Sequence, residues 1–334
     1  MKVLLQNRSN FLTSLAGDSV QLVKTKESLE KLGVDVTISS SDRVDLHEFD
    51  LIHLFNLMPI EETYHFFENA EQYQKKIVLS TIYWDPLEFL RMSGQMDSFG
   101  VWWQKTHPLR EKVLAGTCVI LPNSQLELEL LRQNFARLPQ AAIVPNAADA
   151  IFGTARPDRF RRKHGSDPFV LSVGRICRRK NQLQLIQAMK GLKLPLVFIG
   201  PINDGAYYLE CRKAAAGNPV KFIPEMTPLE LASAYAAARV HALVSWYDTP
   251  GLVSLEAVLA GCQIVTTDRG SAREYFGASV FYCDPADSAD IAQKIGTAWL
   301  TPVQPGFRTE IGRKFSWEEA ARQTYHAYCQ ALDG

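Results

Sequence analysis

The sequence VSWYDTPGLVSLEAVLAGCQIVTT, from Val244 to Thr267, decides the fold of this chain. It predicts a strand that ends near Ser245, a tight loop, a helix over Leu252–Ala260 and a second strand over Ile264–Thr266. A strand, a helix entrance and a returning strand are parts of a βαβ unit, so the segment indicates a parallel sheet.

Two carboxylates stand in this segment with seven residues between them, Asp248 in the loop and Glu256 in the helix. Both can face the crevice at the carboxyl end of the sheet, where open α/β sheets bind ligands. Carboxylates accept hydrogen bonds from sugar or ribose hydroxyls. The alternative is an ordinary turn residue and an exposed helix residue, and the segment alone leaves both open.

The start of the predicted helix is suited to a phosphate. Backbone N–H groups at a helix entrance have no partner inside the helix, and the helix dipole attracts an anion there. Because Pro250 has no N–H, we expect the donors to come from Thr249, Gly251 and Leu252. A phosphate site beside two carboxylates suits a nucleotide sugar.

The composition narrows the class of protein. The 334 residues suffice for two domains, and the 36 basic residues equal the 36 acidic residues, so nothing indicates a nucleic-acid binder. The six cysteines are scattered without metal-ligand spacing, which argues for a reducing compartment and against a structural zinc. No apolar run approaches the about 18 residues that span a bilayer. We therefore expect a cytoplasmic protein without a metal site.

Short apolar runs separated by helical patterns continue through both halves of the chain, which predicts two doubly wound α/β sheets. The longest helical pattern of the first half, Asp18–Leu32, closes on Gly33. Expected strands are Lys2–Gln6, Val34–Ile38, Leu51–Phe55, Ile77–Ile82, Cys118–Leu121, Ala142–Val144, Phe169–Val173, Leu196–Ile199, Val220–Ile223, Val240–Val244, Ile264–Thr266 and Val280–Tyr282. The pattern breaks after Val144, at Pro145-Asn146 and the segment to Pro168, so we place the domain boundary near residue 150.

Three positions of the first half are candidates for a ligand site or for the core. Gly17 stands before a long helix, where backbone can approach an anion, although a plain loop glycine before a capping aspartate fits equally. Tyr83 follows a strand and either stacks on a sugar ring or fills the core. His53 lies inside an apolar strand and is expected to be a core histidine with its hydrogen bonds satisfied.

The stretch from Gly94 to Gly116 is rich in aromatic and basic side chains. Phe99, Trp102 and Trp103 beside Lys105 could contact a membrane surface or a lipid-linked substrate. Local core packing followed by a solvated helix is the favoured alternative.

A second informative stretch, FVLSVGRICRRKNQLQLIQAM, begins at Phe169. A strand runs into Gly174 and Arg175, and Lys180-Asn181 begins a helix after a short loop. A guanidinium and an ammonium at the carboxyl edge of a sheet suit the pyrophosphate of a nucleotide. The glycine-rich fingerprints of dinucleotide and P-loop sites are absent from the sequence.

These two stretches resemble the family 4 (group 1) retaining glycosyltransferases, which have the GT-B fold of two facing Rossmann-like domains with a cleft between them. The matching positions are Gly174, Arg175, Lys180, Asn181, Asp248-Thr249-Pro250-Gly251-Leu252, Glu256-Ala257 and Gly261. Further similarities are Asn123-Ser124, Pro145-Asn146, the turn from Gly270 to Glu274 and Phe315-Ser316-Trp317. They span most of residues 118–330.

The resemblance implies a role for each of these positions. Arg175 and Lys180 would hold the donor diphosphate and stabilise the leaving group, with Gly174 beside them. Asp248 would hold the transferred sugar, and Glu256 the ribose hydroxyls. Gly17 would let backbone meet the diphosphate from the other domain, and Tyr83 stands near the position of a family histidine. Asp248 replaces the usual glutamate, and Thr249-Pro250 replaces the usual Gly-Phe.

The resemblance also implies a domain arrangement and a reaction. Residues 1–150 with 315–334 would form the acceptor-binding domain, and residues 151–314 the nucleotide-sugar-binding domain. The reaction is sugar transfer with retention from a nucleotide-diphosphate donor, UDP- or GDP-linked, to a glycan, glycolipid or other hydroxyl acceptor, as in polysaccharide biosynthesis. Neither a cofactor nor a catalytic metal is expected, and the protein could act at the inner face of the membrane. The alternatives are a sugar-nucleotide epimerase and a non-catalytic nucleotide-sugar-binding subunit.

Overall fold

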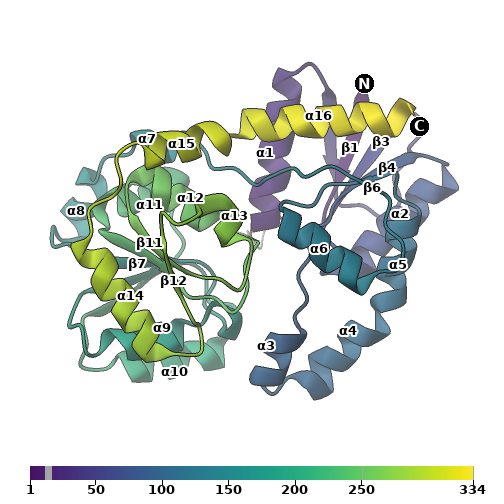
Figure 1. Ribbon diagram of the computed structural model, residues 1–334. Helices are drawn as coiled ribbons and strands as arrows, with labels where there is room; N and C mark the ends of the chain where they lie inside the picture. Colours follow the sequence, from purple (N-terminus) through teal and green to yellow (C-terminus); the bar gives the residue numbers. More distant parts are fainter. Residues whose placement is uncertain (12–16, 250, 334) are drawn as a thin grey trace. The chain divides into compact units, whose positions relative to one another are not determined.

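The computed structural model describes residues 1–11, 17–249 and 251–333, and this part of the chain divides into two compact units (Figure 1). The first unit comprises Met1–Ala147 and Trp317–Gly334, and the second comprises Ala148–Ser316. Ala148 and Phe315 both belong to the second unit, and the Ala148 N–H donates to the Phe315 carbonyl oxygen at 3.2 Å. Phe315 also lies in the apolar core of the second unit. The change of unit therefore falls two residues later than residue 315, where the sequence placed it.

The first unit is built on a six-stranded parallel sheet with the order β2-β1-β3-β4-β5-β6. Its strands are β1 (Lys2–Gln6), β2 (Asp35–Ser39), β3 (Leu51–Phe55), β4 (Lys76–Ser80), β5 (Val119–Ile120) and β6 (Gln140–Ala141). Its helices are α1 (Gly17–Lys31), α2 (Ile60–Gln72), α3 (Leu87–Met92), the π-helix η1 (Met96–Gly100), α4 (Val101–Lys105), α5 (His107–Ala115), α6 (Gln125–Asn134) and α16 (Trp317–Asp333).

The second unit has a six-stranded parallel sheet with the order β12-β11-β10-β7-β8-β9. Its strands are β7 (Val170–Val173), β8 (Leu196–Ile199), β9 (Val220–Ile223), β10 (Val240–Leu243), β11 (Gln263–Thr267) and β12 (Phe281–Cys283). Its helices are α7 (Ile151–Thr154), α8 (Asp158–His164), the 3-10 helix η2 (Arg178–Lys180), α9 (Gln182–Met189), α10 (Gly205–Ala215), α11 (Pro228–Ala237), α12 (Leu252–Ala260), α13 (Ala272–Phe276), α14 (Ser288–Leu300) and α15 (Phe307–Lys314).

The sheet of the second unit is buried on both faces, as continuous apolar strands require. One apolar cluster contains Leu255 and Val258 of α12, and another contains Leu185 of α9 and Ile291 of α14. The helices after the neighbouring strands β7 and β10 thus pack on opposite faces of the sheet. The carboxyl ends of strands β7 and β10 therefore form a topological switch point, where doubly wound sheets bind ligands.

The last helix, α16, packs on the first unit against α1 and the strands β4 and β5 (Figure 1). Its Tyr328 is fully buried, and the Tyr328 hydroxyl lies 2.7 Å from His53 Nδ1. The other ring nitrogen of His53 lies 2.9 Å from Ser80 Oγ. His53 is therefore a core histidine with both nitrogens satisfied, and burial lowers its pKa to about 3.

Tyr83 is also a core residue, with a side chain that is 1% exposed. Its ring stacks on Trp103 with the centroids 6.0 Å apart and meets Phe135 edge-on at 5.5 Å. The assignment of Tyr83 to substrate binding is therefore wrong for this structure, since no surface of the ring is left for a sugar. Its order along the chain, directly after β4, could not distinguish the two alternatives.

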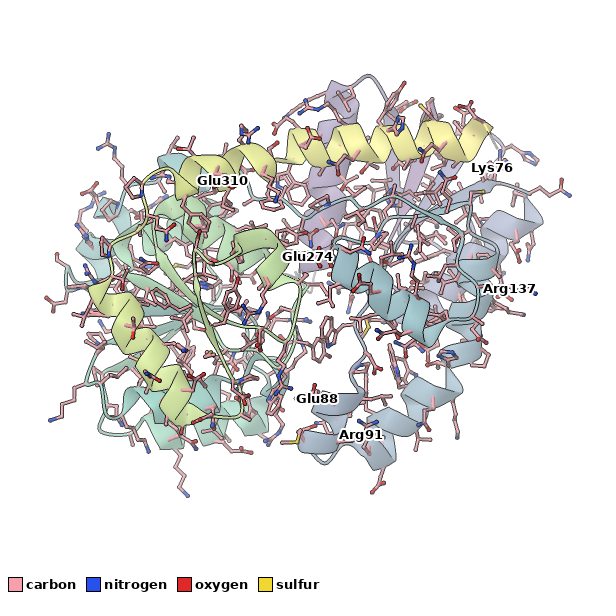
Figure 2. All side chains as sticks on the ribbon, viewed as in Figure 1. Lys76, Glu88, Arg91, Arg137, Glu274 and Glu310 are labelled. Carbon is pink, nitrogen blue, oxygen red and sulfur yellow. The ribbon has the colours of Figure 1, made fainter. Side chains whose placement is uncertain are left out.

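The aromatic stretch after α3 is divided between the core and the surface. Trp103 is buried, whereas Phe99 is 46% exposed and Met92 is 62% exposed. The short helices that carry them lie at the end of the first unit opposite α16, where Figure 2 labels Glu88 and Arg91 on α3. Among the described residues, no helix is long and apolar enough to cross a membrane.

Candidate functional site

The switch point of the second unit carries a compact group of charged side chains. Lys180 ends the 3-10 helix η2 after β7, and Asp248 lies in the loop after β10. The Lys180 Nζ atom donates to both Asp248 oxygens at 2.9 and 2.8 Å. The exposed fractions are 11% for the Lys180 side chain and 16% for Asp248, so this ion pair is largely shielded from water.

A second cation, Arg179, completes this arrangement. Its Nη1 atom donates to Asp248 Oδ1 at 3.1 Å and to the Tyr247 carbonyl oxygen at 2.7 Å. Burial would raise the pKa of the Asp248 carboxyl, but Lys180 and Arg179 outweigh burial and hold this pKa well below its usual range. Asp248 is therefore ionised. No sequence pattern distinguishes Arg179 from its neighbour Arg178.

Two glycines and an asparagine shape the loop that carries the cations. Gly174 has a φ of +145°, and a Cβ on Gly200 would lie 2.3 Å from the Gly174 carbonyl oxygen, so the two loops touch through backbone. Asn181 has a left-handed φ of 61° and donates through Nδ2 to the carbonyl oxygens of Val244 at 3.1 Å and Pro285 at 2.8 Å. Asn181 thus holds Lys180 at the ends of the neighbouring strands.

Arg175 lies in the same loop, is partly exposed, and its carbonyl oxygen accepts a hydrogen bond from Gln182 Nε2 at 2.9 Å. Burial raises the pKa of the Tyr247 hydroxyl, and the positive charges of Arg179 and Arg175 oppose that rise. Within the described ranges, the Arg175 guanidinium makes no hydrogen bond or ion pair with another residue. It is therefore available to a ligand.

The loop after β10 leads into α12, which begins at Leu252. Gly251 has a φ of +88°, and a Cβ at this position would lie 2.6 Å from Leu243 Cδ2, so the entrance to α12 requires glycine. Gly270 closes the other side, because a Cβ there would lie 2.2 Å from the Asp248 carbonyl oxygen. Thr249 precedes this entrance, and Pro250 lies outside the described residues.

Glu256 lies one turn inside α12 and is partly buried. Its Oε2 atom accepts a hydrogen bond of 2.9 Å from the hydroxyl of Tyr235, a buried residue of α11 that no sequence motif indicates. Burial raises the pKa of Glu256 to about 7; the Tyr235 hydrogen bond opposes the rise and the charge of Asp149 adds to it. A carboxylate whose pKa is raised to near neutral pH by burial marks a functional-site candidate.

Replacing Glu256 with glutamine should stabilise the protein at pH 8. The raised pKa means that the folded state binds a proton between pH 4.5 and about 7 that the unfolded state lacks. Stability from this group is present below pH 4.5 and is lost as pH rises through 7. A neutral Glu256→Gln side chain should recover about 1–3 kcal/mol at pH 8 and little at pH 5. Urea unfolding at both pH values measures this, and a less stable variant at pH 8 would contradict it.

Gly17 lies in the first unit, at the start of α1 and directly after residues 12–16, which lie outside the described part. The next residue, Asp18, is buried and pairs with Arg8, whose Nε lies 2.7 Å from Asp18 Oδ2. Asn56, which follows β3, also donates to Asp18 at 3.4 Å. β1 and β3 are neighbours at the switch point of this sheet, so a second polar group lies at the corresponding place.

The structure brings most of the predicted site residues of the second unit to the ends of β7 and β10: Gly174, Arg175, Lys180, Asp248, Thr249, Gly251 and Leu252. In the described part of the chain, no group of three or more His, Cys, Asp or Glu side chains could hold a metal ion.

Comparison with known proteins gives a family and a fold. Residues 156–308 match the family described as glycosyl transferases group 1. The D-inositol 3-phosphate glycosyltransferase of Pseudarthrobacter chlorophenolicus is 28% identical over 247 residues, which cover 66% of this chain and 58% of that protein. The chain therefore spans less than two thirds of this relative. The family match confirms the resemblance drawn from the sequence.

Solved structures are similar over the whole chain. Sucrose-phosphate synthase from Thermosynechococcus elongatus has a TM-score of 0.83 at 15% identity, covering 100% of this chain and 99% of that chain. Anabaena HepE in complex with UDP has a TM-score of 0.75 at 18% identity, covering 98% of this chain and 100% of that chain. At these identities the likeness shows the fold alone. With the two parallel sheets, it confirms the predicted GT-B fold class.

Proposed function

We propose that this chain, whose residues 156–308 match the glycosyl transferases group 1 family, transfers a sugar with retention from a nucleotide-diphosphate donor to a hydroxyl acceptor. The observation that carries the proposal is the group of cations at the ends of β7 and β10. Two cations, Arg179 and Lys180, pair with one carboxylate, Asp248, and a third, Arg175, lies in the same loop after β7. The two unbalanced positive charges match the two negative charges of a nucleotide-sugar diphosphate.

A cavity at the same edge of the second sheet is suited to the nucleoside. It has a volume of about 170 Å³ and lies beyond the ends of β7, β8 and β9. Its lining includes Ile176, Phe198, Pro201, Tyr208, Phe222 and Pro224. A flat base binds well to such an apolar and aromatic wall. Ile176 is the residue after Arg175, so a diphosphate at the cations would leave its nucleoside beside this cavity.

In the proposed complex, each charged residue meets one part of the donor. Glu256 accepts hydrogen bonds from the ribose hydroxyls, and Asp248 accepts them from hydroxyls of the transferred sugar. Arg175 and Lys180 contact the diphosphate, where they stabilise the negative charge that develops as the bond to the sugar breaks. The backbone at the start of α12 can add N–H donors to the phosphate.

The proposed reaction forms one bond and breaks another at the anomeric carbon of the sugar. The bond from this carbon to the β-phosphate oxygen breaks, and the acceptor oxygen attacks the same face, through a transition state with oxocarbenium character. The acceptor proton passes to the departing phosphate oxygen. Since the two unbalanced positive charges of this group can balance the diphosphate, we propose that no metal ion is needed. The first unit, with Gly17 near its switch point, would bind the acceptor.

The test is release of nucleoside diphosphate from UDP-, GDP- and ADP-sugars, with and without a panel of hydroxyl acceptors. We expect acceptor-dependent release that persists in EDTA, and proton NMR should show the anomeric configuration of the donor in the product. Inversion would overturn the retaining mechanism, and loss of activity in EDTA would overturn the metal-free one. Release with free sugar as the only product would favour an epimerase. Donor binding without release from any donor would favour a binding subunit.

A further inference from the structure

We propose that Arg179 is the positioning residue of the sugar-binding carboxylate: it holds Asp248 in place while Lys180 contacts the donor diphosphate. This inference rests on the proposed function and adds a residue to it. In the structure Lys180 donates to both carboxylate oxygens of Asp248. If Lys180 turns part of its hydrogen bonding to the diphosphate, a second group must keep Asp248 ionised and in place. Arg179 already donates to Asp248 Oδ1 and can fill this role.

The contacts of Arg179 join the two loops of the site. Its side chain donates to the Asp248 carboxylate and to the Tyr247 carbonyl oxygen. Its own carbonyl oxygen accepts a hydrogen bond of 2.9 Å from the Trp246 N–H. The guanidinium carbon lies 5.0 Å from the centre of the Tyr247 ring. Arg179, in the loop after β7, therefore holds three consecutive residues of the loop after β10, which end with Asp248.

Charge supports the same assignment. Burial lowers the pKa of Lys180, and Asp248 opposes this effect while Arg179 adds to it. In Arg179 the attraction of Asp248 outweighs burial and raises the pKa above its usual range. Arg179 is thus a permanent cation, whereas the ammonium of Lys180 can exchange one anionic partner for another. The two cations that contact Asp248 differ in role although they are neighbours in sequence.

The matched control is Arg178, the residue next to Arg179 on the same 3-10 helix. Its guanidinium points to other carboxylates: Nη2 lies 2.5 Å from Glu210 Oε1 and Nε lies 3.8 Å from Asp204 Oδ2. Its side chain is 39% exposed, against 19% for Arg179. Arg178→Gln removes the same charge from the same helix without touching Asp248.

The experiment compares Arg179→Gln, Arg179→Lys and Arg178→Gln in the full chain, with kcat and donor KM from the transfer assay and Kd for free UDP from calorimetry. We expect Arg179→Gln to lower kcat about 10- to 100-fold, because small displacements of a positioned group cost this much. The Kd for UDP, which has no sugar, should change less than about threefold, since Arg175 and Lys180 remain. Arg179→Lys should recover part of kcat, and Arg178→Gln should match the wild type.

A double-mutant cycle separates positioning from a general structural role. Because Arg179 acts through Asp248, adding Arg179→Gln to Asp248→Asn should lower kcat little further, whereas independent effects would multiply. Multiplying effects, or equal losses in kcat and UDP binding, would overturn the assignment. Wild-type kcat in Arg179→Gln would overturn it alone, leaving the proposed function in place. Absence of transfer by the wild type would overturn the proposed function and this inference with it.

Discussion

Replacing Arg175 with alanine should reduce sugar transfer about 10²- to 10³-fold, the loss typical of removing one preorganised group that stabilises developing charge. Arg175 is the cation of the site that Asp248 does not engage in the described structure. Its guanidinium is therefore free to contact the departing diphosphate. The loss should appear in both kcat and kcat/KM, because the negative charge on the leaving group grows in the transition state.

This variant separates function from stability. The Arg175 side chain has no hydrogen bond or ion pair within the described residues. The melting temperature of the Arg175→Ala protein should therefore stay within about 2 °C of the wild type. Steady-state transfer and thermal unfolding of the same sample measure both effects. Wild-type turnover in Arg175→Ala would remove leaving-group stabilisation from the role of this residue. A large drop in melting temperature would instead identify a structural contact.

Replacing Arg110 with methionine should lower the free energy of unfolding by about 3 kcal/mol. This is the largest change in stability that we expect from a single substitution. Arg110 lies in α5 of the first unit and is fully buried. Its guanidinium donates to the Leu57 carbonyl oxygen at 3.0 Å, the Trp103 carbonyl oxygen at 3.2 Å and Thr106 Oγ1 at 2.9 Å. Burial lowers its pKa to about 10, so it stays protonated at neutral pH.

The physical reason is that methionine fills the space but satisfies none of these oxygen atoms. It also loses the contact of the cation with the Trp103 ring, whose centre lies 3.6 Å from the guanidinium carbon. Arg132→Met, at an exposed position of α6, is the matched control and should change stability by less than about 0.5 kcal/mol. Denaturant unfolding measures both variants. Equal stabilities would show that the buried oxygen atoms need no cation.

The sequence predicted most of the fold, because buried parallel strands are continuous apolar runs. Leu51–Phe55 and Leu196–Ile199 were predicted with the bounds that the structure has. The weakest element was β6, predicted over Ala142–Val144 and observed at Gln140–Ala141. It is a two-residue strand at the edge of the sheet, which is too short for any periodicity to define.

The candidate site was predicted in its residue types but not in its contacts. Lys180 and Asp248 were assigned to different parts of the donor, whereas the structure pairs them directly. Arg179 was missed because Arg178 and Arg179 are adjacent arginines that no sequence pattern distinguishes. The turn of η2 directs Arg179 to Asp248 and Arg178 to Glu210. Tyr235 was missed because its pattern is that of any apolar residue on α11. Side-chain direction in short loops is set by tertiary contacts that a local pattern does not contain.

The most direct test of the central claim compares binding of nucleoside diphosphates and monophosphates by calorimetry, for the wild type and for Arg175→Ala. If the cations after β7 hold the donor diphosphate, the wild type should bind one nucleoside diphosphate at least about tenfold more tightly than its monophosphate. Arg175→Ala should remove most of that difference, since each phosphate contact to a cation contributes about 1.4 kcal/mol or more. Equal binding of diphosphate and monophosphate by the wild type, or an unchanged preference in Arg175→Ala, would contradict a donor diphosphate site at these residues.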